Sequence, residues 1–379
     1  MTNEKKILFL TGTRADYGKL KSLMWKIQNH NQFELKIFAT GMHMLSKYGL
    51  TWKEIKKDGF EDIYKYINQQ EGTTMDLILS NTVTGLSNYV HEEKPDLIVV
   101  HGDRLEALAG AIVGAFNNIK VAHIEGGEVS GTIDESIRHS ITKLAHIHFV
   151  SNEQAKKRVL QLGEVEESIY VIGSPDVDIM LSDTLPSLEK VRERYQINYD
   201  NYGILLYHPV TTQLEKIKKN VNTLLDALGE SNKNYVVIYP NNDEGNEVIL
   251  KAYKSLDKNE KFKIFPSLRF EYFLTLLKHS DFIIGNSSAG IREAEIFGIQ
   301  SIDIGNRQNN RYDKYKSCNI INVTENKEHI LEAIDQATSK ARYYSQTYGK
   351  GNSDEQFLKI LIDSDIWNFN IQKYFNDKM

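Results

Sequence analysis

Short apolar runs alternate with amphipathic stretches along most of the chain. Runs such as KILFLT (Lys6–Thr11) and DLIVVH (Asp96–His101) are typical of strands buried on both faces of a sheet. Stretches that suit helices lie between such runs, for example Leu105–Phe116. This repeated strand–helix–strand pattern predicts an α/β fold with parallel sheets.

The expected strands fall into two groups. The first group is Lys6–Thr11, Phe33–Phe38, Asp96–His101, Lys120–Ile124, His148–Ser151 and Ser168–Ile172. The second group is Gly203–Tyr207, Tyr235–Tyr239, Lys263–Phe265, Phe282–Ile284, Ser301–Ile304 and Ile320–Val323. Between the groups, Gly173–Pro186 contains two prolines and several turn-forming residues, so it is the candidate linker. We also expect helices at Glu135–Leu144, Lys327–Lys340 and Glu355–Phe375.

The two groups of strands predict two Rossmann-like domains. We place them at residues 1–175 and 176–355, with a terminal helix in 356–379. A length of 379 residues suits two domains. Two open parallel sheets in tandem are expected to face a cleft, and ligands bind such sheets beyond the carboxyl ends of the strands. Residues directly after strands are therefore the first candidates for a site.

Charge and composition exclude several classes of protein. The formal net charge of −5 argues against a nucleic-acid partner. Cys318 is the single cysteine, which excludes an intrachain disulfide and a zinc site with several thiolates. The polar N-terminus has no signal-peptide core, and no run approaches the ~20 apolar residues that span a bilayer. We therefore expect a cytoplasmic protein with no membrane partner.

Three carboxylates follow predicted strands of the first domain. Asp103 and Arg104 follow one strand in HGDR, Glu125 follows the next in HIEGGE, and Asp134 precedes a helix. Clustered carboxylates raise one another's pKa, so that one can serve as an acid while another serves as a base. The structural alternative for Asp103 is a helix N-cap.

Arg14 follows the first strand in TGTRAD. This turn has one glycine and is no dinucleotide fingerprint, and the chain contains no Walker A sequence. A guanidinium at this place suits a phosphate or a carboxylate ligand. The alternative is an ion pair between Arg14 and a surface acid.

The second domain carries an anion-binding pattern. Gly285–Gly290 (GNSSAG) lies between a strand and a predicted helix that runs to Phe297, so Ser287 and Ser288 are expected to bind a diphosphate at a helix N-terminus. Glu293 suits ribose hydroxyls. His208, in YHPVTT, follows another strand and suits a phosphate or a leaving group.

His146 and His148 form an HxH pair on a predicted strand. Alternate strand residues share a face, so the spacing permits a metal ion. No third ligand at a suitable spacing is evident, and we expect packed histidines and no metal.

The runs around these residues resemble the hydrolysing UDP-N-acetylglucosamine 2-epimerase family, in particular its branch serving sialic and legionaminic acid synthesis. The matching runs are GTRADYGKL, ATGMH, VHGDR, AHIEGGEVSGTIDESIRHSITKLAHIH, HPVTT, YPNND, IGNSSAGIRE and IDIGNRQNNR. They occur in the family's order between Lys6 and Arg311. Gly18 departs from the pattern, because some relatives carry serine there.

The resemblance implies a GT-B fold with the nucleotide in the interdomain cleft and a C-terminal helix that crosses back to the first domain. It implies elimination of UDP to a 2-acetamidoglycal, followed by hydration to the free C2-inverted sugar, with no metal or nicotinamide cofactor. Asp103, Glu125 and Asp134 match the acid/base residues, and we add His208 as a catalytic candidate. The residues that match UDP contacts are Arg14, Arg104, His208, Asn241, Leu268, Ser287, Ser288, Glu293 and Arg307. The resemblance also implies a homodimer or homotetramer.

Three other functions share parts of this pattern. A GT-B glycosyltransferase would use the same nucleotide site, but it has no need for three acids in the first domain. A non-catalytic UDP-sugar-binding protein leaves the acids unexplained, and a non-hydrolysing 2-epimerase fits HIEGGEVSGT less well. The sequence leaves the substrate open between UDP-N-acetylglucosamine and UDP-N,N'-diacetylbacillosamine. It also leaves open which acid has which role and whether a downstream sugar nucleotide inhibits the protein.

Overall fold

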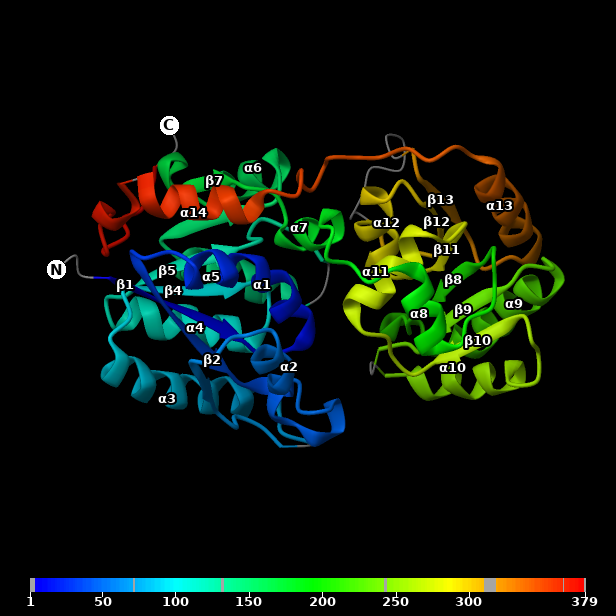
Figure 1. Cartoon of the computed structure of the whole chain (residues 1–379), viewed down its shortest axis with the longest axis horizontal. Coiled ribbons are helices and arrows are strands. Elements are labelled where there is room, and N and C mark those ends of the chain that lie inside the picture. Colours follow the sequence, from blue (N-terminus) through cyan, green and yellow to red (C-terminus); the bar gives the residue numbers. More distant parts are fainter. Residues whose placement is uncertain are drawn as a thin grey trace. The chain divides into compact units, whose positions relative to one another are not determined.

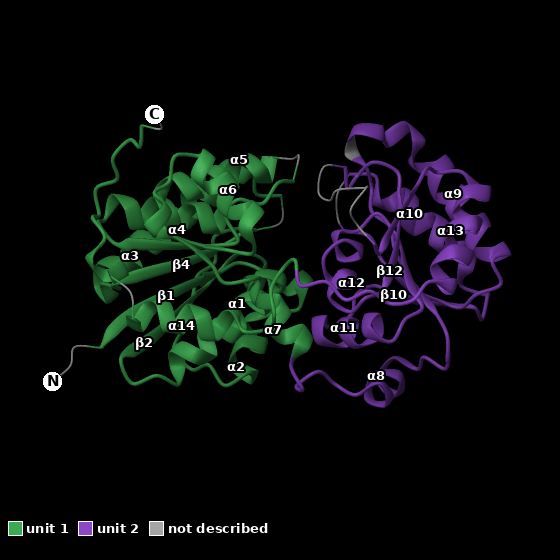
Figure 2. Ribbon diagram, turned by 90° about the horizontal axis from the view of Figure 1, so that it is seen from above, with its two compact units in different colours: residues 1–181, 347–379 green, residues 182–346 purple. Residues whose placement is uncertain are grey.

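Two compact units make up the chain. The computed structural model describes residues 4–70, 72–130, 133–241, 244–309, 318–363 and 365–377. Unit 1 contains residues 1–181 and 347–379, and unit 2 contains residues 182–346 (Figure 2). Asn242, Asp243 and Arg311, which belong to runs YPNND and IDIGNRQNNR, lie outside the described residues.

Unit 1 is built on a parallel sheet. Its described strands are β1 (Lys5–Thr11), β2 (Phe33–Ala39), β3 (Ile63–Lys65), β4 (Leu97–His101), β5 (Lys120–Ile124), β6 (Ile147–Val150) and β7 (Ile169–Val171). The strand order is β3-β2-β1-β4-β5-β6-β7, and the pairings are parallel. Strands β1, β2, β4, β5 and β7 of this sheet are labelled in Figure 1. The chain order changes direction between β1 and β4. Ligands of open α/β sheets bind at such a switch point.

Helices cover both faces of this sheet. They are α1 (Arg14–Gln28), α2 (Trp52–Lys57), α3 (Met75–Glu93), α4 (Leu105–Phe116), α5 (Ile133–Leu144), α6 (Glu153–Gln161), α7 (Pro175–Leu181) and α14 (Ser353–Asp363). Side chains alternate along β1, so Ile7 and Phe9 pack with α1 and α14, whereas Leu8 and Leu10 pack with α3, α4 and α5. Burial on both faces explains the continuous apolar run of this strand.

Unit 2 repeats the arrangement. Its described strands are β8 (Gly203–Leu206), β9 (Tyr235–Ile238), β10 (Phe262–Phe265), β11 (Phe282–Gly285), β12 (Gln300–Ile304) and β13 (Ile320–Val323). They are parallel in the order β10-β9-β8-β11-β12-β13. The switch point of this sheet lies between β8 and β11.

The helices of unit 2 also lie on the two faces of its sheet (Figure 2). They are α8 (Leu188–Tyr195), α9 (Ile217–Glu230), α10 (Asn246–Tyr253), α11 (Phe270–Lys278), α12 (Glu293–Ile296) and α13 (Lys327–Ser339). The helices α9, α10 and α13 share one core with inward side chains of the strands, such as Leu205 and Ile302. Across the described ranges of both units, no helix has the length and apolar character needed to cross a bilayer.

The predicted fold class is confirmed. Both sheets are parallel, both units are Rossmann-like, and the chain is of the GT-B type. The strands expected from apolar runs form within one or two residues of their predicted ends. The short strand β3 was not predicted, because its three residues are partly or fully exposed and carry no apolar run.

One predicted segment is partly right, and another is wrong in its length. The boundary between the units, after residue 181, falls within the candidate linker Gly173–Pro186, but Pro175–Leu181 of this segment forms helix α7 with most of its residues buried. Pro175 occupies the first position of that helix, where a missing N–H carries no penalty. The terminal helix predicted at Glu355–Phe375 ends at Asp363 and is followed by a 3-10 turn at Asp365–Asn368. Leaving the helix there lets Trp367 pack against Phe33.

Candidate active site

The turn after β1 is held by a buried capping box. Thr13 caps α1 by accepting a hydrogen bond from the backbone N–H of Asp16, and the Asp16 carboxylate accepts from the N–H of Thr13 at 3.0 Å. Asp16 also accepts from the N–H of Gly12 at 2.9 Å and from the Thr11 hydroxyl at 2.6 Å. This network fixes the backbone that presents Arg14 at the carboxyl edge of the sheet.

Arg14 already has an acidic partner. Its Nε donates to Glu54 at 2.9 Å and its terminal nitrogen donates at 2.6 Å, which makes a two-pronged ion pair with α2. The alternative considered from the sequence, an ion pair with an acid, is therefore present. A ligand anion at Arg14 would have to share the guanidinium with Glu54.

Asp103 and Arg104 follow β4 at the switch point. The carboxylate of Asp103 forms an ion pair with Arg138, which is buried on α5 and also donates to the carbonyl of Glu128 at 3.0 Å. Arg104 lies next to the buried Glu106, with 3.4 Å between Nε and the carboxylate. The N-cap position of α4 is occupied by Arg104 and not by Asp103, and the Arg104 side chain forms no capping hydrogen bond. The carboxylate of Asp103 is engaged in its ion pair instead.

Glu125 follows β5 and is 4% exposed. One carboxylate oxygen lies 3.2 Å from Nζ of Lys19 and 3.1 Å from Nε2 of His101, and the other accepts from the hydroxyl of Ser174. Its φ of +61° is in the left-handed region, which non-glycine residues adopt at a cost of about 1–3 kcal/mol. Backbone strain of this kind is found preferentially at functional sites.

Asp134 is exposed on the first turn of α5, four residues before Arg138. The three predicted carboxylates therefore belong to one region of unit 1, after the adjacent strands β4 and β5 and on the helix that follows β5. Two of them, Asp103 and Glu125, have basic partners, Arg138 and Lys19. The sequence predicted a cluster of acids, and the structure adds a cationic partner for each of these two.

The predicted UDP contacts of unit 2 follow successive strands of one sheet. In the order of the sheet, these residues are Leu268 after β10, Asn241 after β9, His208 after β8, Ser287 and Ser288 after β11, and Arg307 after β12. Because the strands are parallel, all of these residues lie at the same carboxyl edge. Glu293 begins the short helix α12 after the Ser287–Ser288 turn.

Hydrogen bonds join several of these residues through Asn286. The side chain of Asn286 accepts from the backbone N–H of His208 at 2.7 Å and donates to its carbonyl at 2.9 Å, so the ends of β8 and β11 are tied together. The carbonyl of Asn286 accepts from Arg307 at 3.1 Å and from Gln308 at 2.8 Å. Asn286 lies in the GNSS run, but the sequence pattern assigns it no role.

His208 is held as a neutral donor. Its Nδ1 accepts from the backbone N–H of Asn241 at 3.0 Å, so a neutral ring carries its proton on Nε2. Burial lowers the pKa of His208 to about 3, and the Arg307 guanidinium acts in the same direction. His208 can therefore donate to an oxyanion at neutral pH without carrying a charge.

The helix predicted after GNSSAG is not continuous. The segment forms a 3-10 turn at Ser288–Gly290 and then the four-residue helix α12. A helix this short has little dipole, so anion binding here would depend on individual hydroxyl and N–H donors. Gly285 is required at the end of β11, because its φ is +140° and a Cβ there would lie 2.1 Å from the carbonyl oxygen of Leu206.

Two other features do not belong to these sites. His146 accepts from the N–H of Val121 and contacts the carbonyl of Ile371, while His148 contacts Glu164.

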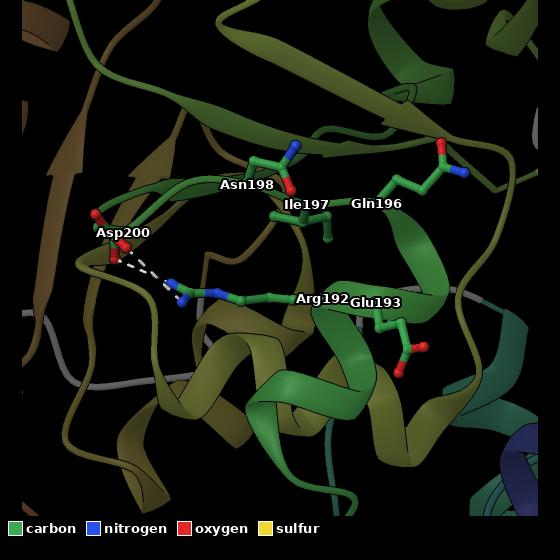
Figure 3. Close-up of a pocket in the computed structure, with 6 residues that line it drawn as sticks. All are labelled: Arg192, Glu193, Gln196, Ile197, Asn198 and Asp200. Atoms are coloured by element: carbon green, nitrogen blue, oxygen red, sulfur yellow. Dashed lines mark hydrogen bonds and ion pairs between the residues drawn. The ribbon is translucent and has the colours of Figure 1, made fainter.

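Figure 3 shows a surface hollow next to α8, where Arg192 reaches across to Asp200. The residues that line this hollow are Arg192, Glu193, Gln196, Ile197, Asn198 and Asp200, and none was predicted as a site residue.

Lys19, His101 and Ser174 contact Glu125 but were not selected from the sequence. Lys19 and His101 lie within runs GTRADYGKL and VHGDR, next to residues that were selected. Ser174 lies in the segment interpreted as a linker. Its contact with Glu125 joins residues 49 positions apart, and no local pattern indicates it.

The chain is similar to known proteins over nearly its whole length. A family profile described as UDP-N-acetylglucosamine 2-epimerase matches residues 25–362. The UDP-N-acetylglucosamine 2-epimerase of Neisseria meningitidis serogroup B is 48% identical over 377 residues, which cover 98% of this chain and 99% of that protein. The UDP-N,N'-diacetylbacillosamine 2-epimerase (hydrolyzing) of Legionella pneumophila is 34% identical over 362 residues, covering 94% and 95%. The crystal structure of UDP-GlcNAc 2-epimerase from Neisseria meningitidis bound to UDP-GlcNAc has the same fold, with a TM-score of 0.81, 19% identity and coverage of 95% and 100%.

Proposed function

The chain belongs to the UDP-N-acetylglucosamine 2-epimerase family, and from this we propose that it is a hydrolysing 2-epimerase that releases UDP and inverts C2 of a UDP-N-acetylhexosamine. The observation that carries the proposal is the placement of Asp103 and Glu125 after adjacent strands, each with a basic partner. A reaction that transfers protons both at a carbon atom and at an oxygen atom needs acids and bases held in position, as these two carboxylates are.

The reaction has two steps. In the first, a base removes the proton from C2, the C1–oxygen bond breaks, and UDP leaves with that electron pair to give a 2-acetamidoglycal. In the second, water adds a hydroxyl at C1 while C2 receives a proton on the opposite face. The sum is one UDP-sugar and one water giving UDP and the free C2-inverted sugar.

Unit 1 supplies the proton-transfer groups in this proposal. Asp103 and Asp134 transfer protons, and Glu125 acts at C2 or activates the water. Lys19 and His101 hold the Glu125 carboxylate at 3.2 and 3.1 Å, which favours one orientation of its oxygens. Arg138 does the same for Asp103.

Unit 2 supplies the groups that bind UDP in this proposal. Ser287, Ser288, Arg307 and the Nε2–H of His208 stabilise the departing diphosphate, because positioned donors are most effective where negative charge develops. Asn241 and the backbone near Leu268 contact the nucleotide, and Glu293 accepts from the ribose hydroxyls. Arg14 and Arg104 add positive charge from unit 1.

UDP-N-acetylglucosamine is the proposed substrate. The relative that is 48% identical over almost the whole chain is named for this substrate, whereas the relative named for UDP-N,N'-diacetylbacillosamine is 34% identical. The free sugar produced would be of the kind that sialic or legionaminic acid synthesis consumes. The second sugar nucleotide is the comparison substrate in the test.

Product analysis by NMR in deuterated water tests the reaction and the substrate together. With UDP-N-acetylglucosamine and no acceptor, we expect free UDP and a free C2-inverted sugar with one deuterium at C2. A UDP-linked epimer would instead indicate a non-hydrolysing enzyme, and turnover only with an added acceptor would indicate a glycosyltransferase. Asp103→Asn, Glu125→Gln and Asp134→Asn should lose turnover and keep UDP binding; wild-type rates in all three would end the proposal.

A further inference from the structure

The chain passes between the two units twice, after residue 181 and before residue 347. Within unit 1, the segments beside these two passages, residues 173–178 and 348–354, lie side by side, and we call them the crossover. The backbone N–H of Ser174 donates to the carbonyl of Tyr348 at 2.7 Å. Gly173 and Gly349 have φ values of +89° and +125°, and a Cβ added to Gly173 would lie 3.0 Å from Cα of Gly349. The two segments therefore approach closely, and the positive φ values favour glycine at both positions.

A buried carboxylate fastens the same two segments further along. Asp178 on α7 accepts from the N–H and the hydroxyl of Ser353, both at 2.9 Å, and from the N–H of Asp354 at 3.0 Å. It thereby caps α14 from outside that helix. Ser22 on α1 donates to Asp178 at 3.1 Å. The crossover is thus held to α1 and to the start of α14 by hydrogen bonds to one buried carboxylate.

The crossover also contacts Glu125. Ser174 is fully buried, and its hydroxyl donates to one oxygen of the Glu125 carboxylate. Lys19 on α1 lies 3.2 Å from the other oxygen and 3.2 Å from Asp176 of the crossover. His101, at the end of β4, lies 3.1 Å from the same carboxylate oxygen as Lys19.

These contacts set the direction of the Glu125 side chain. The backbone of Glu125 is fixed by its N–H, which donates to the carbonyl of Phe149 at 2.8 Å, and by its left-handed φ of +61°. With the backbone fixed, the hydroxyl of Ser174 on one side of the carboxylate and Lys19 and His101 on the other fix the orientation of this group. Tyr348 holds Ser174 in turn through its carbonyl.

We propose that Ser174 is a positioning residue that orients the Glu125 carboxylate, and that the crossover thereby links the connection between the units to this carboxylate. The inference rests on the proposed function, in which Glu125 takes part in the reaction. Because small displacements of a reacting group can reduce the rate by up to about 10²-fold, loss of this contact should affect turnover more than binding.

Ser174→Ala and Ser353→Ala form a matched pair for the test. Each removes one buried serine hydroxyl from the crossover, but the hydroxyl of Ser353 is bonded to Asp178 and not to Glu125. In Ser174→Ala we expect kcat to fall by about tenfold or more, with KM for the UDP-sugar and the affinity for UDP within about twofold of wild type. In Ser353→Ala we expect a comparable loss of stability and a kcat close to wild type. Where the alanine variant of Ser174 does not fold, Ser174→Cys keeps the size, weakens the donor and should show the same split.

Equal losses of kcat in the two alanine variants would overturn the inference, because the hydroxyls would then act only through the stability of the crossover. A wild-type kcat in folded Ser174→Ala would overturn it as well. Glu125→Gln separates this outcome from failure of the role that the proposed function gives to Glu125. If Glu125→Gln has lost turnover, the role proposed for Glu125 stands while that of Ser174 falls; if it turns over at the wild-type rate, the role proposed for Glu125 itself fails.

Discussion

Arg138 on α5 forms an ion pair with Asp103, the second residue after β4. The arginine side chain is 9% exposed, and it also donates to the carbonyl of Glu128 at 3.0 Å. A helix that follows β5 thus holds a carboxylate that follows β4. The two strands are neighbours in the sheet, so the ion pair connects the two strand ends that carry Asp103 and Glu125.

Replacing Arg138 should impair turnover by releasing Asp103. In Arg138→Met we expect kcat to fall by at least about tenfold, since a positioned proton-transfer group contributes about 10²–10⁴-fold. Steady-state kinetics and calorimetric binding of UDP measure the two effects separately, and UDP affinity should change little. Arg158→Met is the control, because Arg158 donates to the carbonyl of Gly127 at 3.2 Å and no contact described for it reaches the three acids. A kcat in Arg138→Met equal to that of the control would contradict the role assigned to the ion pair.

Gly285 should not tolerate a side chain. Its φ of +140° is outside the range of other residues, and a Cβ would lie 2.1 Å from the carbonyl oxygen of Leu206, in the strand that leads to His208. Gly285→Ala is expected to lower the free energy of unfolding by at least about 1–3 kcal/mol and to weaken UDP binding. Gly229→Ala in α9 has open space around the added methyl group and should stabilise the protein by about 0.5–1 kcal/mol. Denaturant unfolding of both variants checks the prediction, and equal stabilities would refute it.

The sequence predicts the sheets well because their strands are buried on both faces. Such strands leave continuous apolar runs, and the residues directly after the runs lie at the carboxyl edge of a parallel sheet. Asp103, Glu125 and His208 could be selected by this rule alone. Their surroundings could not, since Lys19, Ser174 and Arg138 reach them from elements distant in the sequence.

The incomplete and wrong predictions have local causes. The linker predicted at Gly173–Pro186 contains the boundary between the units, but its two prolines gave no sign that Pro175 starts a buried helix. Gly285–Gly290 was expected to open a helix that runs to Phe297, yet the glycine-rich turn breaks it after one 3-10 turn. At the C-terminus a helix was predicted to reach Phe375, but packing of Trp367 and hydrogen bonds from Lys373 within unit 1 determine the path of the chain.

Two fully buried histidines should make the protein less stable in mild acid. Burial lowers the pKa of His123 to about 3 and that of His43 to about 4. In the unfolded chain a histidine titrates near pH 6.5, so between that pH and the folded values only the unfolded state binds the proton. Stability from these residues is therefore present above about pH 6.5 and is lost as the pH falls, by about 1.4 kcal/mol for each histidine between pH 7.5 and 5.5.

The variant His123→Gln isolates one of these contributions. It removes the group that contacts the carbonyl of Gly102 at 2.8 Å and the hydroxyl of Thr142 at 3.1 Å, so it should be less stable than wild type at pH 7.5. The difference from wild type should shrink by about 1.4 kcal/mol at pH 5.5, because glutamine does not titrate. Urea unfolding at the two pH values measures this change. A constant difference would show that His123 is not held neutral by the fold.

Lys373 is expected to stabilise α5 from the C-terminal segment. Its Nζ lies 3.3, 2.9 and 2.6 Å from the carbonyl oxygens of Thr142, Lys143 and Ala145, and 2.5 Å from the carboxylate of Glu164. The last carbonyls of a helix have no partner within the helix, and a cation there also suits the helix dipole. Lys373→Met should therefore cost about 1–3 kcal/mol and speed amide hydrogen exchange in the last turn of α5.

The exposed Lys359 on α14 provides the control. Lys359→Met makes the same chemical change without touching α5, so exchange there should match wild type. Since α5 also carries Asp134 and Arg138, the loosened helix in Lys373→Met should lower kcat while the affinity for UDP stays within about twofold. If exchange in α5 is the same in both methionine variants, Lys373 does not hold the helix. If exchange rises but kcat does not fall, the end of α5 can loosen without moving Arg138 away from Asp103.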